Sequence, residues 1–136
     1  MADHVLVAVD FSSQWPALRA AIERLCEKGY RRMTLVHVLA EEYGRIPDTT
    51  HREHYVQELE AVAATLRGQG AEVNGEVRSG SVVNELLQAA DEHGADLIAI
   101  GKRGRNPVID LLLGSVAEGV CRHSRLPVLL IPVKEA

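Results

Sequence analysis

The 136-residue sequence lacks features that mark several large classes of protein. Aromatic residues make up only 4% of it, and it has two cysteines, Cys26 and Cys121. Both cysteines lie within helical apolar patterns, so we expect buried thiols rather than a disulfide. The six histidines show no HExxH spacing. These shortages exclude a disulfide-rich scaffold, and we expect no metal-ligand site.

Long apolar runs and an excess of basic residues are also lacking. The longest apolar candidate, residues 127–133, contains two prolines and falls far short of the roughly 18 residues of a membrane span. Fifteen basic residues against nineteen acidic ones give a net charge of −4, which disfavours a nucleic-acid partner. The first four residues have no basic segment typical of a signal peptide. The sequence therefore predicts a soluble, cytoplasmic, single-domain protein over residues 1–136.

The residues that are present alternate between two apolar patterns. Continuous apolar runs are typical of strands buried on both faces of a sheet, and apolar residues three and four positions apart are typical of amphipathic helices. Strands are therefore expected at residues 5–9, 33–38, 71–77, 96–100 and 127–131, the third being short and at an edge. Helices are expected from Ser13 to Gly29, Thr50 to Gly68, Ser81 to Gly94 and Ser115 to His123.

Local signals support two of the helix starts and weaken one helix interior. Ser13 is suited to cap the first helix, and Thr50 with Glu53 has the spacing of a capping box. Gly119 lies inside the last predicted helix. We expect it to destabilise that helix by roughly 1 kcal/mol relative to alanine.

Five strands alternating with four helices predict an α/β fold with an open, parallel, Rossmann-like sheet. Right-handed crossovers place helices on both faces and predict the strand order 3-2-1-4-5. Ligands of such sheets bind beyond the carboxyl ends of the strands, at the switch point between strands one and four. Asp10 and Ser12 follow the first predicted strand, and Gly101 follows the fourth. We therefore expect these residues near any ligand.

The segment after the fourth predicted strand has residues suited to binding phosphate. Gly101 and Gly104 let a ligand approach the backbone, and Gly114 with Ser115 opens a helix whose N-terminus favours an anion. The segment also contains three cations, Lys102, Arg103 and Arg105. Together these residues favour a ligand with two or three phosphates.

The same residues also have an interpretation without a ligand. The glycines can be turn residues, and the basic side chains can be solvated. Ser115 with Glu118 forms a capping box, which helices use without any ligand. The residues alone leave both interpretations open, and the position at the switch point favours the phosphate site.

The spacing Gly101-x2-Gly104-x9-Gly114-Ser115 resembles the nucleotide-binding signature of the universal stress protein family. The strand ending at Asp10 and the later strands are similar to that family in the same order. The resemblance implies a bound adenine nucleotide, ATP, ADP or AMP, with or without Mg²⁺. It implies Asp10 near the ribose and adenine, and hydrogen bonds from the backbone around Val38 to the base. The expected nucleotide-binding residues are Asp10, Ser12, Val38, Gly101, Lys102, Arg103, Gly104, Gly114, Ser115 and Val116.

Three functions are compatible with this sequence. The first is a regulatory stress-response protein that binds an adenine nucleotide. The second is a slow ATPase or phosphotransfer enzyme on the same fold, and the third is a nucleotide-free dimerising scaffold. The Walker A spacing is absent, and Asp10 and Asp110 are candidates for only a single metal contact. We therefore expect the first function, with no catalytic residues and at most weak ATP hydrolysis.

The last predicted strand indicates a homodimer. Pro127 and Pro132 flank it, and proline is tolerated on edge strands. The residues between them, 128–131, are all apolar, and an exposed apolar edge is usually covered. Pairing of this edge with a second copy would cover it, and the family resemblance points the same way.

Overall fold

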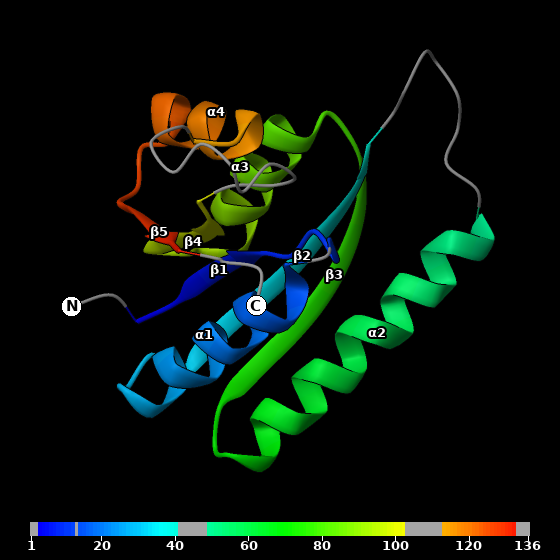
Figure 1. Cartoon of the computed structure of the whole chain (residues 1–136), viewed down its shortest axis with the longest axis vertical. Helices are drawn as coiled ribbons and strands as arrows, with labels where there is room; N and C mark the ends of the chain where they lie inside the picture. The colour runs from blue at the N-terminus through cyan, green and yellow to red at the C-terminus, as the bar shows by residue number, and fades with distance from the viewer. Residues whose placement is uncertain (1–2, 13, 41–48, 103–112, 133–136) are drawn as a thin grey trace.

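A computed structural model describes residues 3–12, 14–40, 49–102 and 113–132, without the side chains of residues 49 and 50. Strands and helices alternate along these residues (Figure 1). The strands are β1 (Val5–Ala8), β2 (Arg32–Ala40), β3 (Glu72–Gly80), β4 (Leu97–Gly101) and β5 (Val128–Ile131). The helices are α1 (Trp15–Glu27), α2 (Thr49–Gly68), α3 (Val82–His93) and α4 (Ser115–His123).

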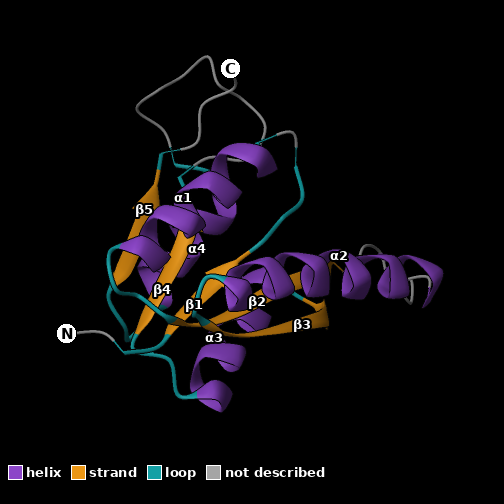
Figure 2. Ribbon diagram, turned by 90° about the horizontal axis from the view of Figure 1, so that it is seen from below, coloured by secondary structure: helices purple, strands orange, loops and turns teal. Residues whose placement is uncertain are grey.

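The five strands form one parallel sheet in the order β3-β2-β1-β4-β5, which confirms the predicted topology. Helices α1 and α2 cover one face, and α3 and α4 cover the other (Figures 1 and 2). Residues 5–7 of the central strand β1 are fully buried, as the continuous apolar run predicts. Their side chains alternate between two hydrophobic clusters, one on each face of the sheet.

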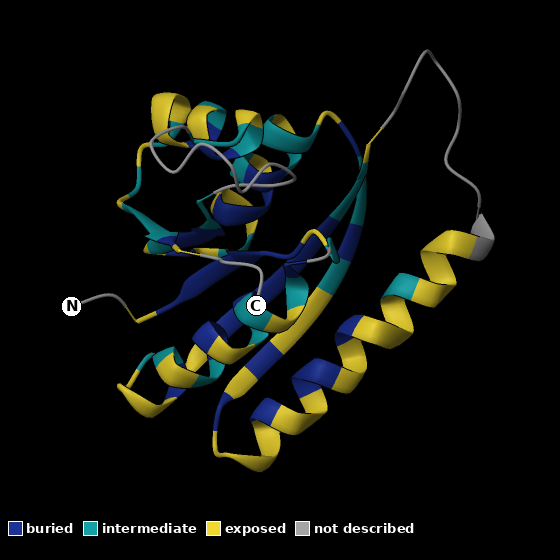
Figure 3. Cartoon of the chain, viewed as in Figure 1, coloured by how far each residue is buried: buried dark blue, intermediate teal, exposed yellow. Residues whose placement is uncertain are grey.

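The third strand is longer than predicted. All nine residues of β3 pair with β2, from Arg32 opposite Glu72 to Ala40 opposite Gly80. Gly75 lies in the interior of β3, where a glycine usually weakens a strand. Its presence has a packing explanation, because a Cβ there would lie 3.1 Å from the Cβ of Leu59 in α2. The glycine therefore lets α2 approach the strand rather than ending it. The buried stripe of α2 faces β3, and its outer face is exposed (Figure 3).

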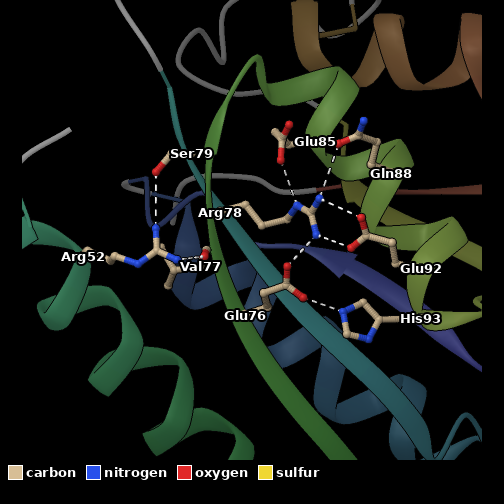
Figure 4. A network of polar contacts seen from close by, with 9 residues as sticks. All are labelled: Arg52, Glu76, Val77, Arg78, Ser79, Glu85, Gln88, Glu92 and His93. Atoms are coloured by element: carbon tan, nitrogen blue, oxygen red, sulfur yellow. Dashed lines mark hydrogen bonds and ion pairs between the residues drawn. The ribbon is translucent and has the colours of Figure 1, made fainter. Parts of the chain in front are cut away.

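Two arginines of α2 cover the free edge of β3. The Nε and Nη2 atoms of Arg67 donate to the Val73 carbonyl at 2.9 and 2.6 Å. Farther along the strand, Arg52 Nη2 donates to the Val77 carbonyl at 2.8 Å (Figure 4). Edge strands with free carbonyl groups tend to pair with other chains. These two arginines occupy two of the carbonyl groups that such pairing would use.

On the other face, Arg78 of β3 joins the strand to α3. Its guanidinium donates to Glu76 at 2.6 Å, Glu85 at 3.0 Å and Glu92 at 2.8 Å (Figure 4). Glu76 also contacts His93 at the end of α3. Because the Arg78 side chain is only 12% exposed, these bonds hold α3 against the sheet more firmly than surface pairs do.

The predicted helix starts are close to the observed ones, but the capping residues differ. Ser13 lies outside the described residues, and Gln14 is the N-cap of α1. Helix α2 begins at Thr49, so Thr50 is already helical and does not serve as its N-cap. Ser115 is the first helical residue of α4, with Gly114 as the N-cap and no side-chain cap. The predicted capping box of α4 is therefore not formed.

Gly119 marks a close contact between α3 and α4. A Cβ at this position would lie 2.8 Å from Cγ2 of Val83 in α3, which is shorter than the van der Waals contacts of real Cβ atoms. The glycine lowers helix propensity, but it allows the two helices to approach. Helix α4 also contains Cys121, which is exposed, so the expected burial is confirmed only for Cys26 of α1. None of the described helices is both long and apolar enough to span a membrane.

Candidate functional site

A cavity of about 440 Å³ opens at the carboxyl ends of β1, β2 and β4. Strand β1 pairs with β2 on one side and with β4 on the other. The strands that follow β1 are added first on the β2 side and then, from β4 onward, on the opposite side. Ligands in open α/β sheets bind at such a switch point. The residues after β1 form one side of the cavity, and the start of α4 forms another.

Seven of the ten predicted site residues line this cavity. They are Asp10, Ser12, Val38, Gly101, Gly114, Ser115 and Val116. Lys102 is not part of the cavity wall, although its backbone links three elements: its N–H donates to the Ile131 carbonyl, and its carbonyl accepts from Gly114 N–H. Arg103 and Gly104 lie outside the described residues, so their expected roles remain predictions.

The loop after β1 is held by short-range hydrogen bonds. Asp10 Oδ1 accepts from Ser12 N–H at 3.1 Å, and Ser12 Oγ accepts from Gln14 N–H at 3.3 Å. Phe11 between them has a φ of 53°, which non-glycine residues rarely adopt. Such strained residues occur preferentially at functional sites. The turn leaves the Asp10 side chain exposed at the rim of the cavity.

The first residues of α4 line the cavity. Gly114, the N-cap, has no side chain with which to cap the helix, and the first N–H groups of a helix have no partner within it. Ser115 is exposed and lines the cavity. The φ of Gly114 is −62°, so the backbone does not itself require glycine there. These donors and the positive end of the helix dipole suit a phosphate group.

The backbone of β2 also faces the cavity. Val9 N–H donates to the Val36 carbonyl at 2.8 Å, so Val36 faces β1. Backbone groups two residues apart along a strand face the same way. The N–H and C=O of Val38 are therefore directed toward the space beyond the end of β1, where the cavity lies.

His37 is a cavity residue that sequence reasoning missed. Its Nδ1 lies 2.7 Å from the Val9 carbonyl, and a carbonyl only accepts, so Nδ1 carries the proton. Burial lowers the pKa of His37, and the ring is neutral at pH 7 with Nε2 as an acceptor. The rings of Phe11 and Tyr55 lie 5.0 and 4.3 Å from it. The sequence does contain a signal for His37, because it is a polar residue inside an apolar strand run.

Gln14 is a second missed cavity residue. It is 3% exposed and lines the cavity. Neither atom of its side-chain amide has a hydrogen-bond partner among the described residues. No sequence pattern singles it out, because glutamine before a helix is most often exposed.

The cavity divides into a buried apolar part and a polar rim. Val36, Leu86 and Ile100 are almost fully buried in its wall, whereas Asp10 and Ser115 are exposed. A flat apolar ring fits the first environment, and hydroxyl or phosphate groups fit the second. Within the described part of the chain, no three His, Cys, Asp or Glu side chains are grouped to hold a metal ion.

Comparison with known proteins agrees with the fold. A model of the universal stress protein family matches residues 1–132. A universal stress protein of Mycolicibacterium smegmatis is 35% identical over 93% of this chain and 96% of its own length. Universal stress protein G of Shigella flexneri is 40% identical over 60% of this chain, and the match spans 57% of that relative.

Solved structures with the same fold include other members of that family. A universal stress protein from Burkholderia pseudomallei has a TM-score of 0.73 and 28% identity, with 96% of each chain covered. A universal stress protein from Archaeoglobus fulgidus, solved in complex with dAMP, has a TM-score of 0.65 and 28% identity, with 95% of this chain and 97% of that chain covered. This chain belongs to the universal stress protein family.

Proposed function

We propose that this chain binds an adenine nucleotide, ATP, ADP or AMP, in the cavity at the switch point and acts as a regulatory stress-response protein. The observation that carries the proposal is the cavity itself, which joins a buried apolar part to the N-terminus of α4, where the N-cap is Gly114. The related Archaeoglobus protein solved with dAMP supports the choice of an adenine nucleotide.

Each part of the nucleotide has a suitable environment. The phosphates lie at the start of α4, where Ser115 and the first N–H groups give charge-assisted hydrogen bonds. The ribose hydroxyls lie near Asp10 at the rim, and the base lies in the apolar part beside the backbone of Val38. Lys102 and Arg103 add positive charge next to the phosphates, and Gly104 lets the loop backbone approach them.

Binding rather than catalysis is proposed because the described wall offers little for hydrolysis. Asp10 is the one carboxylate among the described residues that line the cavity. Phosphoryl transfer relies on groups that position a nucleophile and neutralise charge in the transition state. We therefore propose at most weak ATP hydrolysis, with or without Mg²⁺ on the phosphates.

We further propose that the chain, as one domain over residues 1–136, forms a cytoplasmic homodimer through β5. Strand β5 is outermost and pairs only with β4 among the described strands. Its apolar residues 128–130 are only half-buried. At the opposite edge of the sheet, Arg52 and Arg67 occupy carbonyl groups of β3. Pairing of copies is therefore favoured at β5 and opposed at β3.

Titration calorimetry with ATP, ADP and AMP tests the proposal. We expect a dissociation constant in the roughly micromolar range, which corresponds to about 8 kcal/mol. The absence of heat at tens of micromolar protein, in a sample freed of co-purified nucleotide, would refute binding. Turnover above about 1 s⁻¹ would instead show an enzyme. Sedimentation that shows only a 15 kDa species would refute the dimer.

A further inference from the structure

Gln14 presents an unusual combination of burial and missing partners. Only 3% of its surface is exposed, and it lies in the wall of the cavity. Both its amide oxygen and its amide nitrogen lack a hydrogen-bond partner among the described residues. Its backbone is fixed, since Gln14 N–H donates to Ser12 Oγ and its carbonyl accepts from Leu18 N–H. The side chain is therefore held in the cavity wall by the start of α1.

A buried amide without hydrogen-bond partners lowers the stability of the folded protein. Native structures pair the great majority of buried polar side-chain atoms, and each exception needs an explanation. An apolar residue of similar size would fill the same space without that cost. Gln14 is one of the residues that line the cavity, and its two amide atoms lie just behind the accessible surface. A rotation of the side chain toward the cavity would therefore let a ligand supply both a donor and an acceptor.

The position of Gln14 in the cavity selects the part of the ligand that it meets. Leu18, one turn farther along α1, is also 3% exposed and lines the cavity. Val36 and Leu86 in the same wall are equally buried, whereas Asp10 and Ser115 at the rim are exposed. Phosphates and ribose are hydrophilic and belong at the rim. The group next to Gln14 is therefore the base.

We infer that the side-chain amide of Gln14 binds the edge of the adenine ring and contributes to its selection. Gln14 Oε1 accepts from the 6-amino group, and Gln14 Nε2 donates to the adjacent ring nitrogen, as glutamine does when it reads adenine elsewhere. The inference rests on the proposed nucleotide function and goes further, because it assigns base recognition to a side chain that the glycine pattern does not include.

A binding cycle between the side chain and the base tests this inference. Wild type and Gln14→Met are each titrated with ATP and with purine riboside triphosphate, which lacks the 6-amino group. Met keeps the length and volume but removes both hydrogen bonds. In wild type, we expect loss of the 6-amino group to weaken binding about tenfold. In Gln14→Met, we expect ATP to bind about tenfold more weakly, with a difference between the two nucleotides of twofold or less.

Two controls separate a binding role from a structural one. Gln57 lies on the exposed face of α2, and Gln57→Met should leave the tenfold preference for ATP intact. The nucleotide-free Gln14→Met protein should melt at the same temperature as wild type or a few degrees higher, because an unpaired buried amide has been removed.

The possible outcomes distinguish the inference from the function on which it rests. If wild type binds no adenine nucleotide, both are overturned. If wild type binds ATP and purine riboside triphosphate equally well, the inference alone is overturned, and this arm needs no variant to fold. If the preference for ATP is as large in Gln14→Met as in wild type, Gln14 does not contact the 6-amino group. A preference that collapses only in Gln14→Met supports it.

Discussion

The contact between Gly119 and Val83 gives a prediction in which two opposing effects are separable. The change is Gly119→Ala, in the interior of α4. Helix propensity alone favours alanine by about 1 kcal/mol. Steric overlap opposes it, because the new Cβ would lie 2.8 Å from Val83 Cγ2 and 3.5 Å from Cγ1. Which effect is larger decides the sign of the change in stability.

The structure indicates that the overlap is the larger effect. Val83 lies within α3, where a β-branched side chain has one strongly preferred rotamer and cannot rotate away. One of the two helices must therefore shift, and such overpacking costs about 1–3 kcal/mol. We expect Gly119→Ala to lower the free energy of unfolding by about 1 kcal/mol, measured by urea denaturation. Because α4 begins at the cavity, the shift should also weaken ATP binding.

Two further variants make the reasoning refutable. In a Val83→Ala background the obstructing methyl groups are gone, so Gly119→Ala should stabilise the protein by about 1 kcal/mol. Gly68→Ala serves as a matched control, since a Cβ at Gly68 meets nothing within 4 Å; it should be neutral or slightly stabilising. If Gly119→Ala stabilises the wild-type protein as much as the Val83→Ala protein, close packing does not explain this glycine.

Three other predictions concern the site, its pH dependence and the sheet edge. Gly114→Val should abolish ATP binding in calorimetry while the melting temperature changes little. The φ of −62° suits valine, so only the proposed phosphate site is crowded. Binding that survives would show that the phosphates do not lie at the start of α4. Burial lowers the pKa of His37, so the unfolding free energy should be highest above the ordinary pKa of about 6.5 and should fall as pH drops toward the lower native value. Urea titrations at pH 7.5 and 5.5 should show this fall, reduced in His37→Phe; an equal fall in the variant would assign it to other groups. Arg67→Met should lower stability by about 1–2 kcal/mol and increase association in light scattering, since it exposes the Val73 carbonyl at the edge of β3; unchanged scattering would contradict the protective role.

Most of the fold could be predicted because it depends on patterns that the sequence displays locally. The run at residues 5–9 predicted a buried central strand, and alternation with helices was enough to give the strand order. The length of β3 could not be predicted in the same way. Gly75 lowers strand propensity locally, but its reason is the approach of Leu59 from α2. The predicted capping box of α4 was wrong because the helix begins one residue later than a Ser115 cap requires. Ser115 is the first helical residue, and Gly114 takes the N-cap position.

The part of the candidate site that depends on the backbone could be predicted from the sequence. The part that depends on which side chains are buried in the cavity wall could not. Glycines and an aspartate at strand ends indicate where a ligand can approach the chain, and any phosphate compound would use that approach. Gln14 and His37 reach the cavity only because the turn at Phe11 and the end of β2 bring them there. These side chains lie in the buried part of the cavity, where we propose that the base binds. A chain with the same glycines and different residues at these two positions should therefore keep the phosphate site and change its preference among bases.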